Sequence, residues 1–519
     1  MMRSKREALA LIVGLLVVAC SSGTVSTTAA GGGPATTSGG GGTQATSPPA
    51  ESADITIILA GEPTTLDPQI RDDGNERAVS DNIYETLMSR TPEGELVPGL
   101  ASGEPTQVDE TTWQFTLQEG VTFHNGEPFN ADSVVASVNR IIDPDFASEQ
   151  VSFFSTISGA EAVDDTTVNI LTNEPDPILP ARMYWMKMVP ATASADAAFA
   201  ENPSGTGPYR FVEWVRGDHV TLEANPDYWG DSSNVARVTF RFVPEAGTRL
   251  SALIAGDADV ITNLQPEDVG SAPQSASVTG LEHPMLIINT TEGATADVRV
   301  RQAMNLAVDK QAMADELFGG NATVDQCQIL SESFFGYNPD LEAYGYDPDA
   351  ARALIAEAGA EGATVELIGT SGRWLKDREV VEVVGNFLTE VGLVPEVQIF
   401  EFDEYLNRLF GDIRPPVIYV TSSNELLDAD RQLSAYYHLD GIGASNDDAE
   451  LAGWIDEARS ETDVAAREAL YHQAVQKACD EAYFLFMLNI NDVYGMSERL
   501  QWQPRVDAKI LVKEMTVSA

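Results

Sequence analysis

The stretch ATVELIGTSGRWLKDREVVEVVGNFLTEVGLVPEVQIFEFDEYLNRLFGDIRPPVIYVTSS, residues 363–423, alternates strand and helix patterns. Strands are expected at 363–369, 394–402 and 415–420, with helices at 377–392 and 403–410. A β-α-β-α-β unit of this kind builds a parallel sheet with right-handed crossovers, and ligands bind such sheets beyond the carboxyl ends of the strands. We therefore predict an α/β fold with a ligand site near the polar, acidic loop 421–433.

A second α/β block is predicted in the first half of the chain. DITIILA (54–60) has the composition of a strand, and the loop GEPTTLDP (61–68) follows it. Strand patterns recur between residues 209 and 264, around a helix that contains Leu250 and Leu253. Two blocks, each with a polar loop at a strand end, predict a cleft between two lobes. Further helices are predicted at 78–90, at 131–142 after the cap Asn130, at 297–318 before Gly319 and Gly320, and at 348–358 between the cap Asp347 and Gly359.

The N-terminus has the pattern of a lipoprotein signal. Three basic side chains within residues 3–6 precede twelve apolar or glycine residues, 8–19. Spanning a bilayer takes about 20 apolar residues, so the run fits a secretory signal better than the alternative, a transmembrane anchor. VVAC (17–20) resembles the lipobox of bacterial lipoproteins. This resemblance implies a signal peptide of residues 1–19, lipidation of Cys20, and membrane attachment through that lipid alone.

Residues 20–53 consist almost entirely of Ser, Thr, Gly, Ala and Pro, including GGGPATTSGGGG. Such a segment buries too little apolar surface to offset its ordering entropy, so we predict a disordered tether. About 465 of the 519 residues remain, enough for two or three domains. No later stretch reaches 18 consecutive apolar residues, so the folded part is expected to be soluble.

The formal net charge is −49, from 31 basic and 80 acidic side chains. Phosphate contacts require Lys and Arg, so nucleic acid is excluded as a partner. An anionic lipid surface would also repel the chain, which leaves the lipid on Cys20 as the means of attachment. The acidity suits solubility, and it would equally steer a cationic ligand; charge alone leaves both readings open.

The three cysteines are assigned two different roles. With Cys20 assigned to lipid, Cys327 and Cys479 remain as an even pair in an oxidising compartment, and we predict a disulfide between them. The alternative is two buried thiols acting as small apolar side chains, because Cys479 lies in a helical pattern.

The sequence lacks the motifs of common enzymes. It has no GxSxG, HExxH, P-loop or dinucleotide-binding glycine pattern. The five histidines are scattered, with no pair spaced for metal ligation. We therefore predict a protein that is not an enzyme, without metal or cofactor.

Several stretches together carry a family resemblance, and they run across nearly the whole chain after the tether. They include TLDP (65–68), TWQFTLQEGVTFHNGEPFNADSVVASVNR (112–140), GTGPYRFVEW (205–214), NPDYWG (225–230), VRQAMNLAVDK (300–310) and YDPDAARALIAEAG (346–359). The chain resembles the family 5, or cluster C, solute-binding proteins of ABC importers, the dipeptide-, oligopeptide- and nickel-binding group.

The resemblance implies a type II periplasmic-binding-protein-like fold with two lobes, a hinge and an inserted extra domain. Domain I would comprise residues 54–80, 195–288 and 490–519, domain II residues 81–194, and domain III residues 289–489. The protein would be a monomer that closes on its ligand by hinge motion and so forms the surface recognised by the membrane permease.

The resemblance also suggests ligand contacts. Peptide-binding relatives hold the peptide amino group with a carboxylate in the loop after the third-domain strand, and Glu425 best matches that position. Its alternative role is a solvated loop acid, and the nearby candidates are Ser423, Asn424 and Asp428. Further candidates are Gly61 and Glu62 before the LDP turn, Arg373 and Trp374 after strand 363–369, and Asn489 at the hinge. Trp374 could equally be a packing residue.

The predicted function is therefore that of an extracytoplasmic lipoprotein that captures a solute, predicted to be an oligopeptide, and delivers it to an ABC permease with its ATPase subunits. Within the family, the alternative is another polar solute or a metal chelate. From a different class, the chain could be a surface sensor or adhesion module without an importer.

Overall fold

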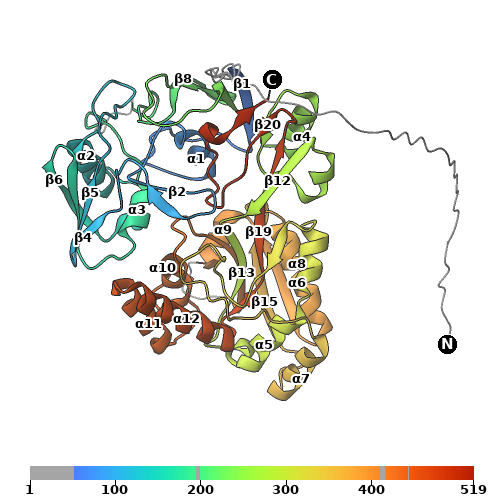
Figure 1. Cartoon of the computed structure of the whole chain (residues 1–519). Coiled ribbons are helices and arrows are strands. Elements are labelled where there is room, and N and C mark those ends of the chain that lie inside the picture. The colour runs from blue at the N-terminus through green and yellow to red at the C-terminus, as the bar shows by residue number, and fades with distance from the viewer. Residues whose placement is uncertain (1–51, 194–198, 410–414, 442, 519) are drawn as a thin grey trace, which may run out of the picture. The chain divides into compact units, whose positions relative to one another are not determined.

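The computed structural model describes residues 52–193, 199–409, 415–441 and 443–518. The predicted signal peptide, Cys20 and the tether up to residue 51 lie outside the described residues. No helix within the described ranges is long and apolar enough to cross a membrane. Three larger sheets organise the described chain, and helices pack beside them (Figure 1).

The first sheet has eight strands, ordered β12-β19-β11-β1-β10-β9-β8, with β14 also paired to β19. Its strands are β1 (Ala53–Leu59), β8 (Tyr209–Val215), β9 (His219–Ala224), β10 (Val235–Phe242), β11 (Val260–Ile261), β12 (Gln274–Thr279), β14 (Ala322–Val324) and β19 (Leu488–Met496). β1 runs parallel to both of its neighbours, β10 and β11. Ile57 and Leu59 pack into one buried cluster and Ile58 into another, so both faces of the predicted first strand are covered.

The second sheet has the order β4-β5-β7-β6. Its strands are β4 (Thr106–Asp109), β5 (Thr112–Thr116), β6 (Ile157–Asp164) and β7 (Thr167–Thr172), and the helices near it are α2 (Ala131–Ile142), η1 (Val151–Phe154) and α3 (Leu179–Trp185). α2 begins as predicted, because Asn130 and Ser133 form a reciprocal capping box. Phe115, Val134 and Val138 lie in the apolar core shared by this sheet and α2.

The third sheet has the order β16-β15-β17-β13-β18. Its elements in chain order are β13 (Glu282–Ile288), β15 (Thr364–Thr370), α8 (Asp377–Glu390), β16 (Val394–Phe400), α9 (Phe402–Leu409), β17 (Val417–Ser423) and β18 (Phe484–Phe486). β15 pairs in parallel with both β16 and β17, which confirms the predicted β-α-β-α-β unit.

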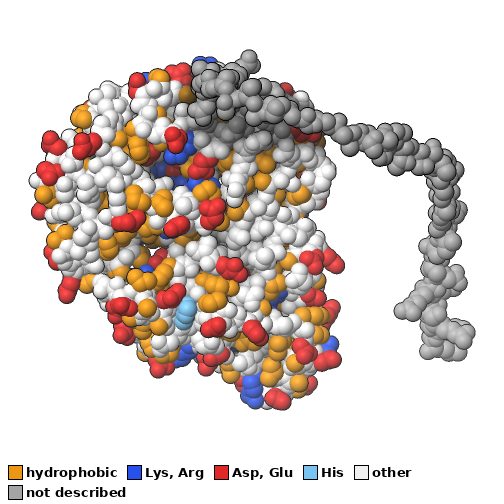
Figure 2. Space-filling model, in the orientation of Figure 1, with side chains coloured by type: hydrophobic (Ala, Val, Ile, Leu, Met, Phe, Trp, Pro, Cys, Tyr) orange, Lys and Arg blue, Asp and Glu red, His pale blue; other side chains and the backbone are white. Residues whose placement is uncertain are grey.

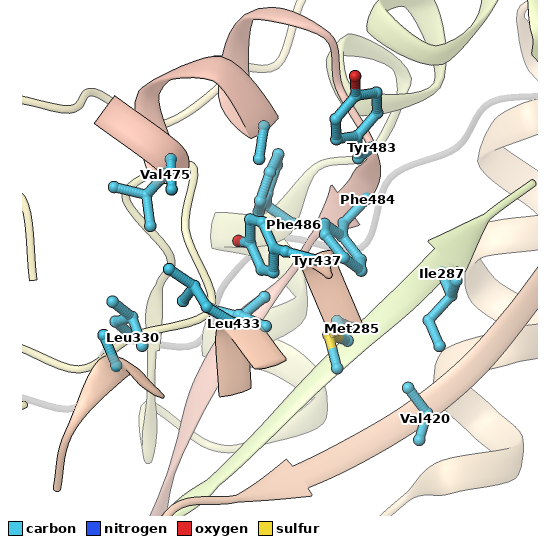
Figure 3. Packing of buried hydrophobic residues seen from close by; sticks show 14 of the residues in the cluster. Met285, Ile287, Leu330, Val420, Leu433, Tyr437, Val475, Tyr483, Phe484 and Phe486 are labelled. Carbon is cyan, nitrogen blue, oxygen red and sulfur yellow. The ribbon is translucent and has the colours of Figure 1, made fainter. Parts of the chain in front are cut away.

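Both faces of the third sheet are buried. Met285 and Ile287 of β13 pack against residues from β18, η5 (Leu433–Tyr437) and α12 (Val464–Asp480), as Figure 3 shows. The alternating residues Leu286 and Ile288 join a cluster on the opposite face with α5 (Val298–Ala307), α7 (Pro348–Ala358) and α8. Two-sided burial explains why β13 reads as a nearly continuous apolar run.

The remaining elements are shorter or lie at the edges. They are α1 (Gly74–Ser80), β2 (Met88–Arg90), β3 (Leu96–Pro98), α4 (Ala246–Ala255), η2 (Pro266–Ser271), η3 (Ala294–Ala296), α6 (Lys310–Ala312), η4 (Met313–Leu317), α10 (Ala429–Gln432), α11 (Ala449–Ser460), β20 (Leu500–Gln501), η6 (Val512–Glu514) and β21 (Thr516–Val517). A disulfide joins Cys327, after β14, to Cys479 in α12.

The prediction of a helix at 78–90 was wrong. α1 begins earlier, because the Asp73 side chain accepts hydrogen bonds from the backbone of the first turn, and it ends at Ser80. Asn82 then donates its amide to the carbonyl of Ile510 at 2.9 Å, and residues 88–90 pair with β3. The expected helix is therefore absent beyond Ser80, because Asn82 binds a residue more than 400 positions away and residues 88–90 form a strand.

The predicted single helix at 297–318 is divided. α5 ends at Ala307, because Val308 has an extended backbone with φ −94° and ψ 121°. The Asp309 side chain then caps α6 by accepting a hydrogen bond from the Ala312 backbone at 2.9 Å. A strong capping residue inside the apolar pattern thus starts a new helix.

Two extended connections pass between the first and third sheets. Gly280 and Leu281 link β12 to β13, and Met487 links β18 to β19. The first connection contacts β19 just after the second connection, since the Gly280 backbone donates to the carbonyl of Ile490 at 3.0 Å. A Cβ atom on Gly280 would lie 2.5 Å from that carbonyl oxygen, so only glycine fits the crossing.

Candidate ligand-binding site

Charged side chains from elements of the first and third sheet regions converge near the strand crossing, beside two aromatic rings from the region of the second sheet. We call five of them the central charged cluster: Arg77 of α1, Glu282 at the start of β13, Glu425 after β17, Arg431 of α10 and Asp492 of β19. Figure 2 shows Lys, Arg, Asp and Glu side chains together in a hollow of the visible face, at the level of α1 in Figure 1.

Arg77 is a buried cation with weak partners. Its residue is 7% exposed, and its guanidinium lies 4.5 Å from the centre of the Trp185 ring. The closest carboxylate is that of Asp72, 3.9 Å from Nε, and Nε itself has no hydrogen-bond partner. Asp72 is bound more closely by Lys187, at 2.9 Å. Burial favours the neutral guanidine, but Asp72 and Glu425 outweigh it and raise the pKa of Arg77, which stays charged.

Two aromatic rings connect Arg77 to Arg431. The rings of Trp185 in α3 and Phe153 in η1 stack with centres 5.9 Å apart and an interplanar angle of 25°. The Arg431 guanidinium covers Phe153 at 4.1 Å, as Arg77 covers Trp185. Each cation therefore lies on an aromatic face, an arrangement that stabilises a partly desolvated guanidinium.

Glu425 is buried and already neutralised. It is 8% exposed, its carboxylate lies 3.1 Å from Nε of Arg431, and it accepts a hydrogen bond from Ser423 Oγ at 2.6 Å. Burial would raise the pKa of Glu425, but Arg431 and Arg77 outweigh that effect and lower it. Glu425 is thus an ionised carboxylate whose charge is shared by two protein cations.

Glu282 and Asp492 have the opposite character. Neither carboxylate forms a hydrogen bond or ion pair with another described residue. Burial, with a contribution from Asp492, raises the pKa of Glu282 to about 7, and burial raises the pKa of Asp492 to about 6. Glu282 is nevertheless exposed and Asp492 is half-buried, so both carboxylates are accessible from solvent.

The strand crossing brings these two acids together. Glu282 stands opposite Ser423 in the antiparallel pairing of β13 with β17, next to Glu425. Asp492 stands opposite Val278 in the pairing of β12 with β19, and its carboxyl carbon lies over Gly280. The short link from β12 to β13 therefore holds both carboxylates near the carboxyl end of β17.

Three predicted loop residues have structural contacts. Asn424 is fully buried and donates to the carbonyl of Asp428 at 2.9 Å. Asp428 caps α10 and accepts from Nη2 of Arg467 at 2.5 Å. Ser423 contributes through its hydrogen bond to Glu425. Of the predicted loop residues, Glu425 belongs to the central charged cluster and Ser423 adjoins it, while Asn424 and Asp428 hold the loop.

The candidates before the LDP turn lie elsewhere. The Glu62 carboxylate accepts hydrogen bonds from Trp214 Nε1 and from the Gly217 backbone, each at 3.0 Å, and so holds the β8–β9 hairpin. A Cβ atom on Gly61 would lie 2.7 Å from the Asn75 side chain, so this glycine lets α1 approach.

The remaining candidates differ in exposure. Arg373 is exposed and contributes to the electrostatics of Glu282. Trp374 makes edge-to-face contacts with Phe402, Tyr405 and Tyr419, which is the packing role left open from the sequence. Asn489 is buried and donates to Ser331 Oγ at 2.5 Å.

Sequence reasoning missed Arg77, Glu282, Arg431 and Asp492. One signal was available: Glu282 and Asp492 are acidic residues within strand-forming, largely apolar stretches, LEHPMLII and NINDVYG. Arg77 and Arg431 gave none, because a basic residue in a polar helical segment is ordinarily solvated.

The loop after β17 is held by the apolar core of the second sheet. Leu426 is 2% exposed and belongs to the apolar cluster of the second sheet. Arg90 also donates to the carbonyl of Leu426 at 2.5 Å. This insertion fixes Glu425 and Arg431 relative to Phe153.

No three His, Cys, Asp or Glu side chains in the described part of the chain are grouped so that they could hold a metal ion. The described groups gathered at the site are charged side chains and aromatic rings.

Comparisons with known proteins show what the whole chain is similar to. The chain is 27% identical over 468 residues to the dipeptide-binding protein of Escherichia coli, covering 81% of this chain and 86% of that protein. It is 26% identical over 478 residues to the glutathione-binding protein GsiB of Pectobacterium atrosepticum, covering 88% and 92%. Both relatives are named as binding proteins for these solutes.

A solved structure of HbpA2 from Haemophilus parasuis matches with a TM-score of 0.80 and 24% identity, covering 90% of this chain and all of that one. The match confirms the predicted fold class, an α/β periplasmic-binding-protein-like type II fold with an inserted domain. The model of the bacterial extracellular solute-binding proteins, family 5, matches residues 95–444. The chain therefore belongs to the family 5 bacterial extracellular solute-binding proteins.

Proposed function

We propose that this extracytoplasmic solute-binding protein captures a short peptide or a similar amino-acid-derived solute and delivers it to an ABC import permease with its ATPase subunits. The observation that carries the proposal is the central charged cluster, in which Arg77 lies close to the unpartnered carboxylates of Glu282 and Asp492. Opposite charges at one site suit a solute that bears both an amine and a carboxylate. Relatives named for dipeptide and glutathione binding support the same class.

Capture would proceed by closure about the two strand connections. The cluster draws Arg77 from the first sheet region and Glu425 from the end of the third sheet, so relative motion of these regions would open and close the site. Closure excludes water, which strengthens each polar contact with the solute. The closed form would present the surface that the permease recognises.

We propose the domain boundaries and the anchor on sequence grounds. Domain I would comprise 54–80, 195–288 and 490–519, domain II 81–194 and domain III 289–489, and each large sheet draws its strands mainly from one of them. The lipid on Cys20 would hold a monomer at the outer face of the cytoplasmic membrane. Replacing Cys20 with serine should release the protein from the membrane fraction without changing its thermal unfolding.

The function is tested by identifying what the purified protein carries. The full chain is purified gently, weighed by native mass spectrometry and then denatured to release its ligand. A series of peptide masses supports the proposal, whereas a single non-peptide mass or a metal chelate contradicts the peptide reading. Loss of uptake of that solute on deletion of the partner permease supports import, and unchanged uptake would favour a sensor.

A further inference from the structure

We propose that Asp492 and Glu282 bind the cationic group of the captured solute, while Arg77 binds its carboxylate. The ligand class is thus a compact zwitterion, recognised at the strand crossing and α1. This inference deepens the proposed function and rests on it only for the capture of a solute.

Glu282 and Asp492 supply the negative charge of the site. Neither carboxylate has a hydrogen-bond or ion-pair partner among the described residues, and Glu282 is exposed while Asp492 is half-buried. Their surroundings raise both pKa values and so disfavour the ionised forms. An external cation can reach both carboxylates and would supply the missing charge and hydrogen-bond donors.

Arg77 is a buried cation whose partners are distant. This side chain is more than nine-tenths buried, its Nε has no hydrogen-bond partner, and its hydrogen bond to the Asp72 carbonyl is long, at 3.4 Å. The carboxylates of Asp72 and Asp81 are already paired with another cation, since Lys187 lies 2.9 Å from Asp72 and 3.2 Å from Asp81. A buried guanidinium with only distant carboxylates is an anchor for an external carboxylate.

Arg77 acts on both acids. It lowers the pKa of Asp492 and of Glu282, yet it forms an ion pair with neither. On the cationic side, Arg77 lies on the ring of Trp185, and Arg431 lies on the stacked ring of Phe153 and pairs with Glu425. A solute placed between Arg77 and the two acids would meet positive charge at one side and negative charge at the other.

Glu425, which the sequence favoured as the contact for a ligand amine, is already paired within the protein. Its charge is already shared by Arg431 and Arg77, and Ser423 donates to it. A ligand amine would have to compete with these groups, whereas the carboxylates of Asp492 and Glu282 are free of protein partners. The structure therefore assigns Glu425 a positioning role, holding Arg431 over Phe153.

The test uses the full chain and isothermal titration with defined probes: L-alanine, L-alanyl-L-alanine, its N-acetyl form, its C-terminal amide and glycine betaine. Asp492→Asn and Glu282→Gln are compared with wild type, and Glu498→Gln, an exposed acid between β19 and β20, is the matched control. Thermal unfolding establishes that each variant folds. Arg77→Lys tests the contact with the ligand carboxylate. If the Arg77 variant fails to fold, the two acid variants decide the test.

We expect at least one zwitterionic probe to bind, and Asp492→Asn and Glu282→Gln each to weaken it by about 10- to 100-fold, with Glu498→Gln unchanged. N-acetylation should cost a similar factor, as should the C-terminal amide. Binding of betaine but of no peptide would uphold this inference and overturn the peptide function. Equal peptide binding by wild type and both acid variants would uphold the peptide function and overturn this inference. Binding of no probe would overturn both.

Discussion

The carboxylate of Glu425 lies 3.1 Å from the guanidinium of Arg431, which in turn covers the ring of Phe153. The pair joins the end of β17 to η1 and leaves Glu425 little free charge. Charge pairing inside the protein thus decides which acid is available to a ligand.

Glu425→Gln should change ligand affinity less than threefold (on the order of 0.6 kcal/mol) while lowering stability. The reason is that the substitution removes a partner of Arg431 and Arg77, an effect of about 1–3 kcal/mol for a buried charge-assisted contact. Titration with the co-purified ligand and denaturant unfolding measure the two effects. A loss of affinity larger than that of Asp492→Asn would show that Glu425 contacts the ligand.

The stability of the ligand-free protein should fall as the pH rises, because Glu282 and Asp492 then lose their protons. Their pKa values are raised from 4.5 to about 7 and from 3.8 to about 6. The folded state therefore holds more protons than the unfolded chain in this range, so the contribution of these groups falls as pH increases through it. Arg77, Arg373 and Glu425 are the other charged groups that act on Glu282.

Glu282→Gln removes one of these groups and tests the sign. At pH 8 the apo variant should melt about 1–2 °C above wild type, and at pH 4 the two should melt together. Differential scanning calorimetry of both proteins, with Glu498→Gln as control, gives the comparison. A variant that melts below wild type at pH 8 would show that the ionised Glu282 stabilises the fold.

Asp428 should prove structural. Asp428→Asn leaves Arg467 without its buried partner and should lower the free energy of unfolding by about 3–5 kcal/mol. Arg467→Met should cost a similar amount, and the double variant should cost less than the sum of the two. Additive effects in chemical denaturation would mean that the two side chains do not act as a pair.

Leu426→Ala should loosen the loop that carries Glu425. It removes a side chain from the core of the second sheet, at a cost of about 2–5 kcal/mol, and should speed hydrogen exchange across residues 424–431. Leu426→Met keeps the volume and should cost less than about 1.5 kcal/mol. Unchanged exchange in the alanine variant would show that Arg90 alone secures the loop.

Reduction of the disulfide should destabilise the protein. Cys327 and Cys479 are 152 residues apart in sequence, so the bond closes a long loop, and its loss should cost about 2–5 kcal/mol. Thermal unfolding with and without reductant measures this. The doubly substituted Cys327→Ser, Cys479→Ser variant should melt like the reduced wild type and should not respond to reductant.

Local patterns determined the elements of this protein. The β-α-β-α-β unit, the cap at Asn130 and the helix between Asp347 and Gly359 are set by periodicity and by side chains a few residues apart, and all lie where they were predicted. The predictions failed where a distant partner intervened, as when Asn82 bonds Ile510 and ends the expected helix.

The site was determined only by tertiary structure. Sequence placed Glu425 at the strand end, but its neutralisation depends on Arg431 and Arg77, and Arg77 is brought there by a different sheet region. Glu282 and Asp492 come near one another because the connection from β12 to β13 contacts β19 at Gly280. The physical reason is that the charge state and availability of a side chain depend on burial and on neighbours in space, and local periodicity carries no information about either.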